Sequence, residues 1–377
     1  MDLDLTSEQE LIRDTVRAFA RERVAPVAEE LDREARFPVE LVRELAELGL
    51  MGIPISERYG GAGGDTVSYA IAIEELTRID SSVAITVAAH TSLGTMPINL
   101  FGSDEQKERW LPDLASGRKL AAFGLTEPDA GSDAGATRTT AELRDGSWVV
   151  NGSKMFITNA GTELTWGVTI TARTGEDEIS NIVVENGTPG YEISGPLHKL
   201  GWKASDTREL TFADCAVPEG NLLGPRGEGF HQFLEILDGG RISVAAMGVG
   251  LAQGAYDLAD AYARERRQFG KQIGKFQAVA FKLADMAVEI EAGRQLVSKA
   301  AWLKDQGRPF ALEAAMAKLY TGELSHRVVN QALQIHGGYG FMDEFPISRL
   351  YRDQKILEIG EGTNEVQRMV IAKHLGL

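Results

Sequence analysis

Five short motifs carry the residues best suited to chemistry, and they lie far apart in the chain: FGLTEPDAGSD (123–133), MFITNAG (155–161), RRQFG (266–270), QIHGGYGF (334–341) and EIGEGTNEVQR (358–368). Small residues and hydroxyls in the first two suit close backbone approach to a flat ligand. An arginine beside a glycine-bearing break can hold a pyrophosphate. Glu361 stands between two glycines, which give its carboxylate little side-chain cover. Taken singly, each motif is more often an ordinary turn.

Motifs for other chemistries are absent or misplaced. Gly248, Gly250 and Gly254 have the wrong spacing for a dinucleotide fingerprint and fall inside a predicted helix. The six histidines show no paired metal spacing, there is no CxxC, and we expect no metal site. No Walker-type loop and no GxSxG elbow occurs.

The first third of the chain must form helices. Thr6 with Gln9 and Ser7 with Glu10 are capping-box pairs ahead of an apolar face at helical spacing. The residues of that face are Leu11, Ile12, Val16, Phe19, Ala20, Val24, Val27 and Leu31. Further helices are predicted over about 39–48 and 68–79, and from the Ser103–Gln106 cap to Trp110.

From about residue 121 the period changes to that of short strands, predicted at 148–150, 168–172, 181–184, 191–193 and 210–213. Asp145-Gly146 and Asn151-Gly152 predict two hairpin turns. These features predict a mainly antiparallel β domain.

Helical periodicity returns for long stretches at about 230–266, 278–304, 312–336 and 364–374. Ala246, Gly250 and Gly254 recur at every fourth residue, which predicts a flat stripe where another helix packs closely. A bundle of long helices follows, and the order helical, β, helical excludes an alternating βαβ sheet.

The length, net charge and cysteine content of the chain restrict the functions that it can have. At 377 residues two or three domains are expected. The net charge of −16 disfavours nucleic acid as a partner. The single Cys215 fits a reducing compartment, and we expect it to be a packing residue. No secretory signal and no membrane-spanning run is visible, so a cytoplasmic protein is expected.

Together, TEPDAGSD, the RxxFG element, QIHGGYGF and EGTNE resemble the acyl-CoA dehydrogenase family over essentially the whole chain. The resemblance implies an α+β multidomain fold with an N-terminal helical domain (1–120), a middle β-barrel domain (121–228) and a C-terminal four-helix bundle (229–377). It also implies FAD, an acyl-CoA substrate, an electron-transfer flavoprotein as electron acceptor, and either a dimer or a homotetramer built as a dimer of dimers.

Site residues are implied by position. Flavin contacts match Phe123, Leu125, Thr126, Gly131, Ser132, Phe156 and Thr158, with Phe156 where many relatives carry Trp. Contacts to the adenine dinucleotide half, typically from a neighbouring subunit, match Arg266, Gln268, Phe269 and Gln277. Contacts on the pyrophosphate side match Gln334 and Gly338. Further cofactor contacts match Thr363 and Glu365. Substrate contacts match Ser132, Asp238, Arg241, Gly360 and Gly362.

Glu361 matches the catalytic base of most members, and some relatives place the base at the position of Gly240, which carries no acid here. The base would remove the α-proton of the thioester, and its own backbone N–H would stabilise the enolate oxygen. Hydride transfer to the flavin then gives the trans-2-enoyl thioester. Many straight-chain members carry Tyr before the base; Gly360 here favours short or branched acyl groups.

Four other functions are compatible with some of these features. An oxidase, or a dehydrogenase of carrier-protein-bound acyl groups, would keep the fold; oxidases are generally longer, and flavin monooxygenases of this fold typically lack the base. A non-enzymatic binding protein, such as the DNA-binding relatives, needs a basic surface that this acidic chain lacks.

Overall fold

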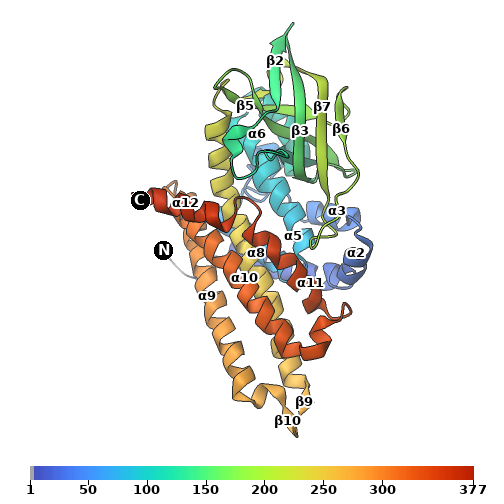
Figure 1. Cartoon of the computed structure of the whole chain (residues 1–377), viewed down its shortest axis with the longest axis vertical. Coiled ribbons are helices and arrows are strands. Elements are labelled where there is room, and N and C mark those ends of the chain that lie inside the picture. Colours follow the sequence, from blue (N-terminus) through green and yellow to red (C-terminus); the bar gives the residue numbers. More distant parts are fainter. Residues whose placement is uncertain (1–3) are drawn as a thin grey trace.

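A computed structural model describes residues 4–377; residues 1–3, the start of the segment searched for a signal sequence, lie outside it. Helices of the first third adjoin a β domain at one end of an elongated molecule, and the long C-terminal helices extend to the other end (Figure 1). The three predicted textures are therefore confirmed in their predicted order.

The N-terminal helices pack an apolar face inward. Thr6 caps the first helix through the predicted capping box with Gln9, whereas Ser7 is already helical and makes no second box. Leu11 is 67% exposed and does not belong to the buried face, although Val16 and Leu31 are fully buried. The helices are α1 (Ser7–Phe19), α2 (Ala28–Glu34), α3 (Val39–Glu47), α4 (Thr66–Thr77), α5 (Ser81–Ala88), α6 (Met96–Phe101) and α7 (Asp104–Ala115), and a π-helical turn covers Ala89–Thr95.

The β domain is one largely antiparallel sheet, in the order β6-β7-β3-β2-β4-β5-β8, with β1 parallel to β4. Its strands are β1 (Leu120–Gly124), β2 (Thr140–Arg144), β3 (Ser147–Thr158), β4 (Thr165–Arg173), β5 (Ile179–Glu185), β6 (Tyr191–Ile193), β7 (Thr207–Pro218) and β8 (Leu222–Leu223).

Only one of the two predicted hairpin turns exists. Asp145 and Gly146 both have positive φ and join β2 to β3 in a two-residue turn. Asn151 and Gly152 instead lie inside β3, at a shift of its register with β7. Gly152 is needed there because a Cβ would come within 2.7 Å of the Thr139 backbone. Glycine in this pair therefore serves a bulge rather than a turn.

The C-terminal part contains the longest helix, α8, which runs from the β domain to the far end of the molecule (Figure 1). The elements are α8 (Gly229–Glu265), β9 (Arg267–Gln268), β10 (Lys271–Gln272), α9 (Gln277–Asp305), α10 (Ala311–His336), α11 (Pro346–Asp353) and α12 (Asn364–His374).

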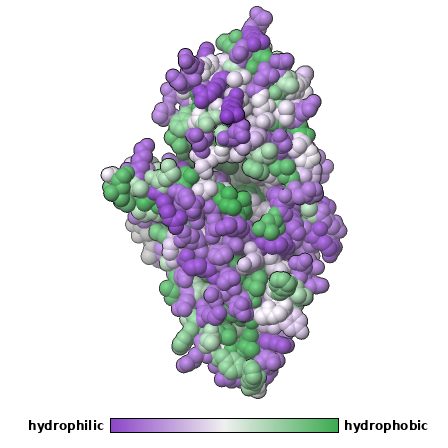
Figure 2. All heavy atoms as spheres, in the orientation of Figure 1, coloured by the Kyte–Doolittle hydropathy of each residue, from purple (hydrophilic) through white to green (hydrophobic). Residues whose placement is uncertain are grey.

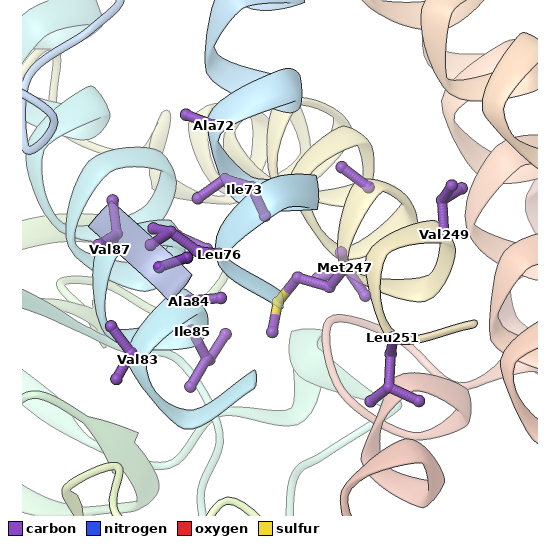
Figure 3. Close-up of a cluster of buried hydrophobic side chains, with 14 of the residues drawn as sticks. Ala72, Ile73, Leu76, Val83, Ala84, Ile85, Val87, Met247, Val249 and Leu251 are labelled. Carbon is purple, nitrogen blue, oxygen red and sulfur yellow. The ribbon is translucent and has the colours of Figure 1, made fainter. Parts of the chain in front are cut away.

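The small-residue stripe on α8 lets α4 approach closely. A Cβ on Gly250 would meet the carbonyl oxygen of Glu74 at 2.3 Å, and one on Gly254 would meet that of Arg78 at 2.2 Å. Figure 3 shows the core formed there, where apolar side chains of α4 and α5 face Met247 on α8. The close packing predicted from spacing is confirmed, and it ties the N-terminal helices to the C-terminal bundle.

Cys215 lies buried on β7 within the core of the β domain, and burial raises the pKa of its thiol to about 11. It is therefore a packing residue. Between residues 4 and 377, no helix is both long and apolar enough to cross a bilayer. Over the same residues, no group of three or more His, Cys, Asp or Glu side chains is arranged to hold a metal ion.

Candidate active site

Glu361 lies in a tight loop that precedes α12. Its φ of 52° is in the left-handed region, which is uncommon for a residue with a side chain and marks local strain. Two buried side chains hold the loop: Lys318 on α10 donates to the carbonyl oxygen of Gly362 at 2.8 Å, and Gln367 on α12 donates to the same oxygen at 3.0 Å. Because these bonds fix the loop, the direction of the Glu361 side chain is set by the fold.

The carboxylate of Glu361 points into the protein. Neither of its oxygens has a hydrogen-bond partner among residues 4–377, and both are buried. The carboxylate lies against α8, where a Cβ on Gly240 would meet Oε2 at 2.1 Å, and the same point is 3.4 Å from Leu93. A buried carboxylate without donors is costly unless it has a function or a ligand.

Burial raises the pKa of Glu361 to about 7, and the positive charges of Lys318 and Arg241 partly oppose that rise. A carboxylate with this pKa can both accept and release a proton near neutral pH. Its backbone N–H donates to no acceptor in the part of the chain that the structure describes. A proton acceptor and a free N–H donor therefore lie in one residue.

Asp238 and Arg241, predicted near the thioester, form an ion pair on the first half of α8. Arg241 is buried, and its Nε has no partner among the described residues. Burial lowers the pKa of Arg241, while Asp238 and Glu361 oppose that change. The pair thus adjoins Glu361 and leaves one donor free for a ligand.

The predicted flavin-end residues come together on β1, β3 and the loop after β1. The backbone N–H of Met155 donates to the carbonyl oxygen of Thr126 at 2.8 Å, which joins the two motifs. Phe156 has a φ of 64° and is 65% exposed, so a strained backbone presents an aromatic face to the outside. A Cβ on Gly131 would meet nothing within 4 Å. Thr158 ends β3 and Ser132 is exposed in the loop.

A small apolar cluster links this region to the base. Phe123 of β1 packs with Phe233 and Ile236 of α8, and Leu93 and Leu125 pack against the same cluster. Leu93 also lies 3.4 Å from the point at which a Cβ on Gly240 would meet the Glu361 carboxylate. The flavin-end residues and Glu361 therefore border one junction between the β domain and α8.

The residues predicted for the adenine half lie elsewhere. Arg266, Gln268 and Gly338 line a cavity of about 540 Å³, together with Tyr262 and Tyr339. The Arg266 guanidinium lies 5.6 Å from the centre of the Tyr339 ring. This cavity adjoins the β9–β10 hairpin, at the end of the molecule remote from the β domain (Figure 1).

Other residues predicted for the cofactor are accessible. Phe269 is 93% exposed, and Figure 2 shows hydrophobic residues gathered at that end of the molecule. Gln277 begins α9 and Gln334 lies on the last turn of α10, both exposed. Thr363 caps α12 and Glu365 is exposed in its first turn. Within one chain, the residues predicted for the two halves of the dinucleotide therefore lie far apart.

Sequence reasoning missed the residues that support the site. Lys318 continues the buried face of α10 formed by Ala314, Thr321 and Ser325, so a lysine in an apolar stripe was the available signal. Lys154 continues the inward alternation of Trp148 and Val150 on β3.

Lys154 and Glu127 form a fully buried ion pair at 2.7 Å. Although burial opposes it, hydrogen bonds from Lys154 and Thr137 lower the pKa of Glu127 to about 2. Lys154 also donates to the carbonyl oxygen of Leu125 at 3.2 Å. This pair therefore anchors the loop that carries the flavin-end residues.

The chain has a helical, β and helical architecture with a buried acid where α8 meets the β domain. Comparisons with known proteins give its family. Models of the acyl-CoA dehydrogenase family match the chain throughout: the N-terminal domain at residues 6–118, the middle domain at 122–215 and the C-terminal domain at 227–376. The chain belongs to the acyl-CoA dehydrogenase family, and the predicted fold class is confirmed.

Individual relatives agree. The chain is 51% identical to a probable acyl-CoA dehydrogenase of Bacillus subtilis, with 100% of both chains covered. It superposes on the butyryl-CoA dehydrogenase of Megasphaera elsdenii with a TM-score of 0.98 and 44% identity, covering 100% of both chains. A chain from a structure described for the electron transferring flavoprotein of Acidaminococcus fermentans gives a TM-score of 0.97 at 44% identity, covering 100% of this chain and 99% of that one.

The cofactor is FAD, as the resemblance implied. The residues present fit it: an exposed aromatic face at Phe156, open space above Gly131 and a cavity edged by Arg266 and Gly338 suit a planar ring, a close backbone approach and a pyrophosphate. When bound, the flavin supplies the acceptor for a hydride.

Proposed function

We propose that this protein desaturates short acyl-CoA thioesters at the α and β carbons, with Glu361 as the base. The observation that carries the proposal is the buried, unpaired carboxylate of Glu361 at the junction of α8 and the β domain. The family fixes the reaction class; the position of this group supports the residue assignment.

In the proposed reaction, the Glu361 carboxylate takes the α-proton of the bound thioester. The free N–H of the same residue supports the developing negative charge on the thioester oxygen. Lys318 and Gln367 hold the loop so that both groups keep their direction. The fold excludes water from the carboxylate, which strengthens these interactions.

Short acyl groups are supported by two features. Butyryl-CoA is the substrate in the name of the Megasphaera elsdenii relative, which this chain matches along its whole length. Gly360 leaves room beside the base, because a Cβ there would meet only Ile356, at 3.3 Å and beyond. Because Gly360 stands where many straight-chain members carry Tyr, there is space here for a branch on the reacting carbons. Isobutyryl- and isovaleryl-CoA therefore belong among the test substrates.

We infer that two subunits complete one FAD site. The flavin-end residues lie at the β domain, whereas Arg266 and its cavity lie at the far end of the same chain. A second copy that places its hairpin against the first would supply the missing half, and a dimer of such dimers gives the expected homotetramer. An electron-transfer flavoprotein is the proposed electron acceptor, in line with the structure from Acidaminococcus fermentans.

Anaerobic titration of the purified yellow protein tests the function. We expect butyryl-, isobutyryl- or isovaleryl-CoA to bleach the flavin absorbance, and octanoyl-CoA to do so poorly. A clear optimum for octanoyl-CoA would contradict the proposed chain length. If none of the four acyl-CoA thioesters bleached the flavin, the proposed function would be contradicted.

A further inference from the structure

A cavity of about 200 Å³ lies beside the proposed base, between α8, α4 and the π-helical turn Ala89–Thr95. The Glu361 carboxylate lies against Gly240, and Leu93 lies 3.4 Å from the point that a Cβ on Gly240 would occupy. The residues next to Gly240 and Leu93 in sequence, Gly239 and Ser92, line the cavity. Tyr69 also lines it, and the charge of Glu361 contributes to raising the pKa of this tyrosine. The cavity is therefore adjacent to the carboxylate and large enough for an alkyl chain of a few carbons.

Lys304, near the end of α9, reaches this cavity. Its Nζ would lie 3.1 Å from a Cβ on Gly239, and it lies 5.8 Å from the ring centre of Phe310. Its ammonium forms no side-chain hydrogen bond or ion pair within residues 4–377; the nearby charges that act on it are those of Asp305 and Glu235. Burial lowers the pKa of Lys304, as expected for a cation withdrawn from water.

The position of Lys304 is fixed by its neighbour. The carboxylate of Asp305 accepts hydrogen bonds from the backbone N–H groups of Thr66 and Val67, at 2.8 and 3.1 Å. These bonds attach the end of α9 to the beginning of α4, and Thr66 also lines the cavity. The hydrogen bonds of Asp305, the next residue in sequence, thus hold Lys304 at the wall of the cavity.

We propose that Lys304 is a specificity-determining residue that limits the length of the acyl chain. This inference rests on the proposed function, because it assumes that the cavity beside Glu361 receives the tail of the substrate. A short tail ends among Ile236, Tyr69 and Ser92, whereas a longer alkyl tail would press against the ammonium of Lys304. Apolar carbon against a partly buried ammonium is unfavourable, so the longer chain is rejected.

Three holoprotein variants test the inference. Lys304→Met removes the charge and keeps an unbranched stem, Lys304→Arg keeps the charge, and Lys299→Met is the matched control on the same helix. Lys299 is 52% exposed and pairs with Glu313 at 3.4 Å, away from the cavity lining. The measured quantity is the ratio of kcat/KM for octanoyl-CoA to kcat/KM for butyryl-CoA, with FAD content and melting temperature as checks of integrity.

We expect Lys304→Met to raise this ratio by about tenfold or more, which is the usual discrimination of a pocket against extra methylene groups. Lys304→Arg and Lys299→Met should leave it at or below the wild-type value. If Lys304→Met is unstable, Lys304→Gln, which also removes the charge, should shift the ratio in the same direction.

An unchanged ratio in the neutral variants, or an equal rise in Lys304→Arg, would overturn the role of Lys304. Either result in a protein whose wild-type flavin bleaches with butyryl-CoA leaves the proposed function intact. Absence of bleaching in the wild type would instead overturn the proposed function, and this inference with it.

Discussion

The carboxylate of Glu361 occupies the space that a side chain at Gly240 would need: a Cβ on Gly240 would lie 2.1 Å from Oε2. The two residues come from different elements, the loop before α12 and the first half of α8. Since some relatives carry the base at the position of Gly240, the two alternative positions converge on one point in space.

Gly240→Ala should impair catalysis because its methyl group would displace the carboxylate. A displacement of about 1 Å at a reacting group commonly costs about 100-fold in rate, so we expect a loss of that order in kcat/KM with FAD content unchanged. A double variant, Glu361→Gly with Gly240→Glu, should recover activity relative to Glu361→Gly alone. Wild-type activity in Gly240→Ala would show that the carboxylate need not lie there.

The pH dependence of kcat/KM should follow Glu361. Since the base must be deprotonated and its pKa is about 7, activity should fall as the pH decreases through that value. Lys318→Met removes a positive charge that lowers this pKa, so the midpoint of the profile should move to higher pH. Lys299→Met serves as a control and should not move it. A wild-type midpoint near the ordinary value for glutamate would contradict the assignment.

The raised pKa of Glu361 should also make the stability of the folded protein depend on pH. A carboxyl whose pKa is raised in the folded state contributes stability that is present below its unfolded pKa and is lost as the pH rises through about 7. A rise from 4.5 to about 7 corresponds to roughly 3 kcal/mol. The melting temperature of Glu361→Gln, measured relative to that of the wild type, should therefore be higher at about pH 9 than at about pH 5. The same difference in melting temperature at both pH values would contradict this.

The Lys154–Glu127 pair should matter for both folding and cofactor retention. Lys154→Met leaves Glu127 buried without its ammonium partner, and removing one member of a buried ion pair typically costs about 3 kcal/mol or more. We expect lower stability in denaturant unfolding and loss of FAD on gel filtration. Adding Glu127→Gln should restore part of the stability, because no unpaired charge then remains. Equal stabilities of the wild type and Lys154→Met would contradict the anchoring role.

Local patterns predicted much of the architecture. Asp145-Gly146 had to form a turn because both residues adopt positive φ readily, and the stripe of Gly250 and Gly254 had to receive a close neighbour. The same reasoning was wrong for Asn151-Gly152, because an identical turn signal is also the signal of a bulge. Only the pairing of β3 with β7 distinguishes the two.

The sequence motifs predicted which residues belong to the candidate site, but not how those residues are arranged in space. Glu361 was found from its glycine neighbours and the family resemblance, whereas its burial against Gly240 depends on how α8 crosses the loop before α12. Lys318 and Lys304 were not predicted as site residues, because a single lysine on a helix is usually solvated, even where it continues a buried face as Lys318 does. Their roles depend on tertiary contacts made by other residues, such as the bonds of Asp305 to α4.

The most direct test of the base is anaerobic titration of the Glu361→Gln holoprotein with butyryl-CoA, compared with the wild type and with the exposed-residue control Glu344→Gln. We expect the variant to stay yellow, to bind the ligand with a change in its flavin spectrum, and to bleach at least about 1,000-fold more slowly than the wild type, within the range for loss of a general base. Bleaching at a rate close to that of the wild type would contradict the account.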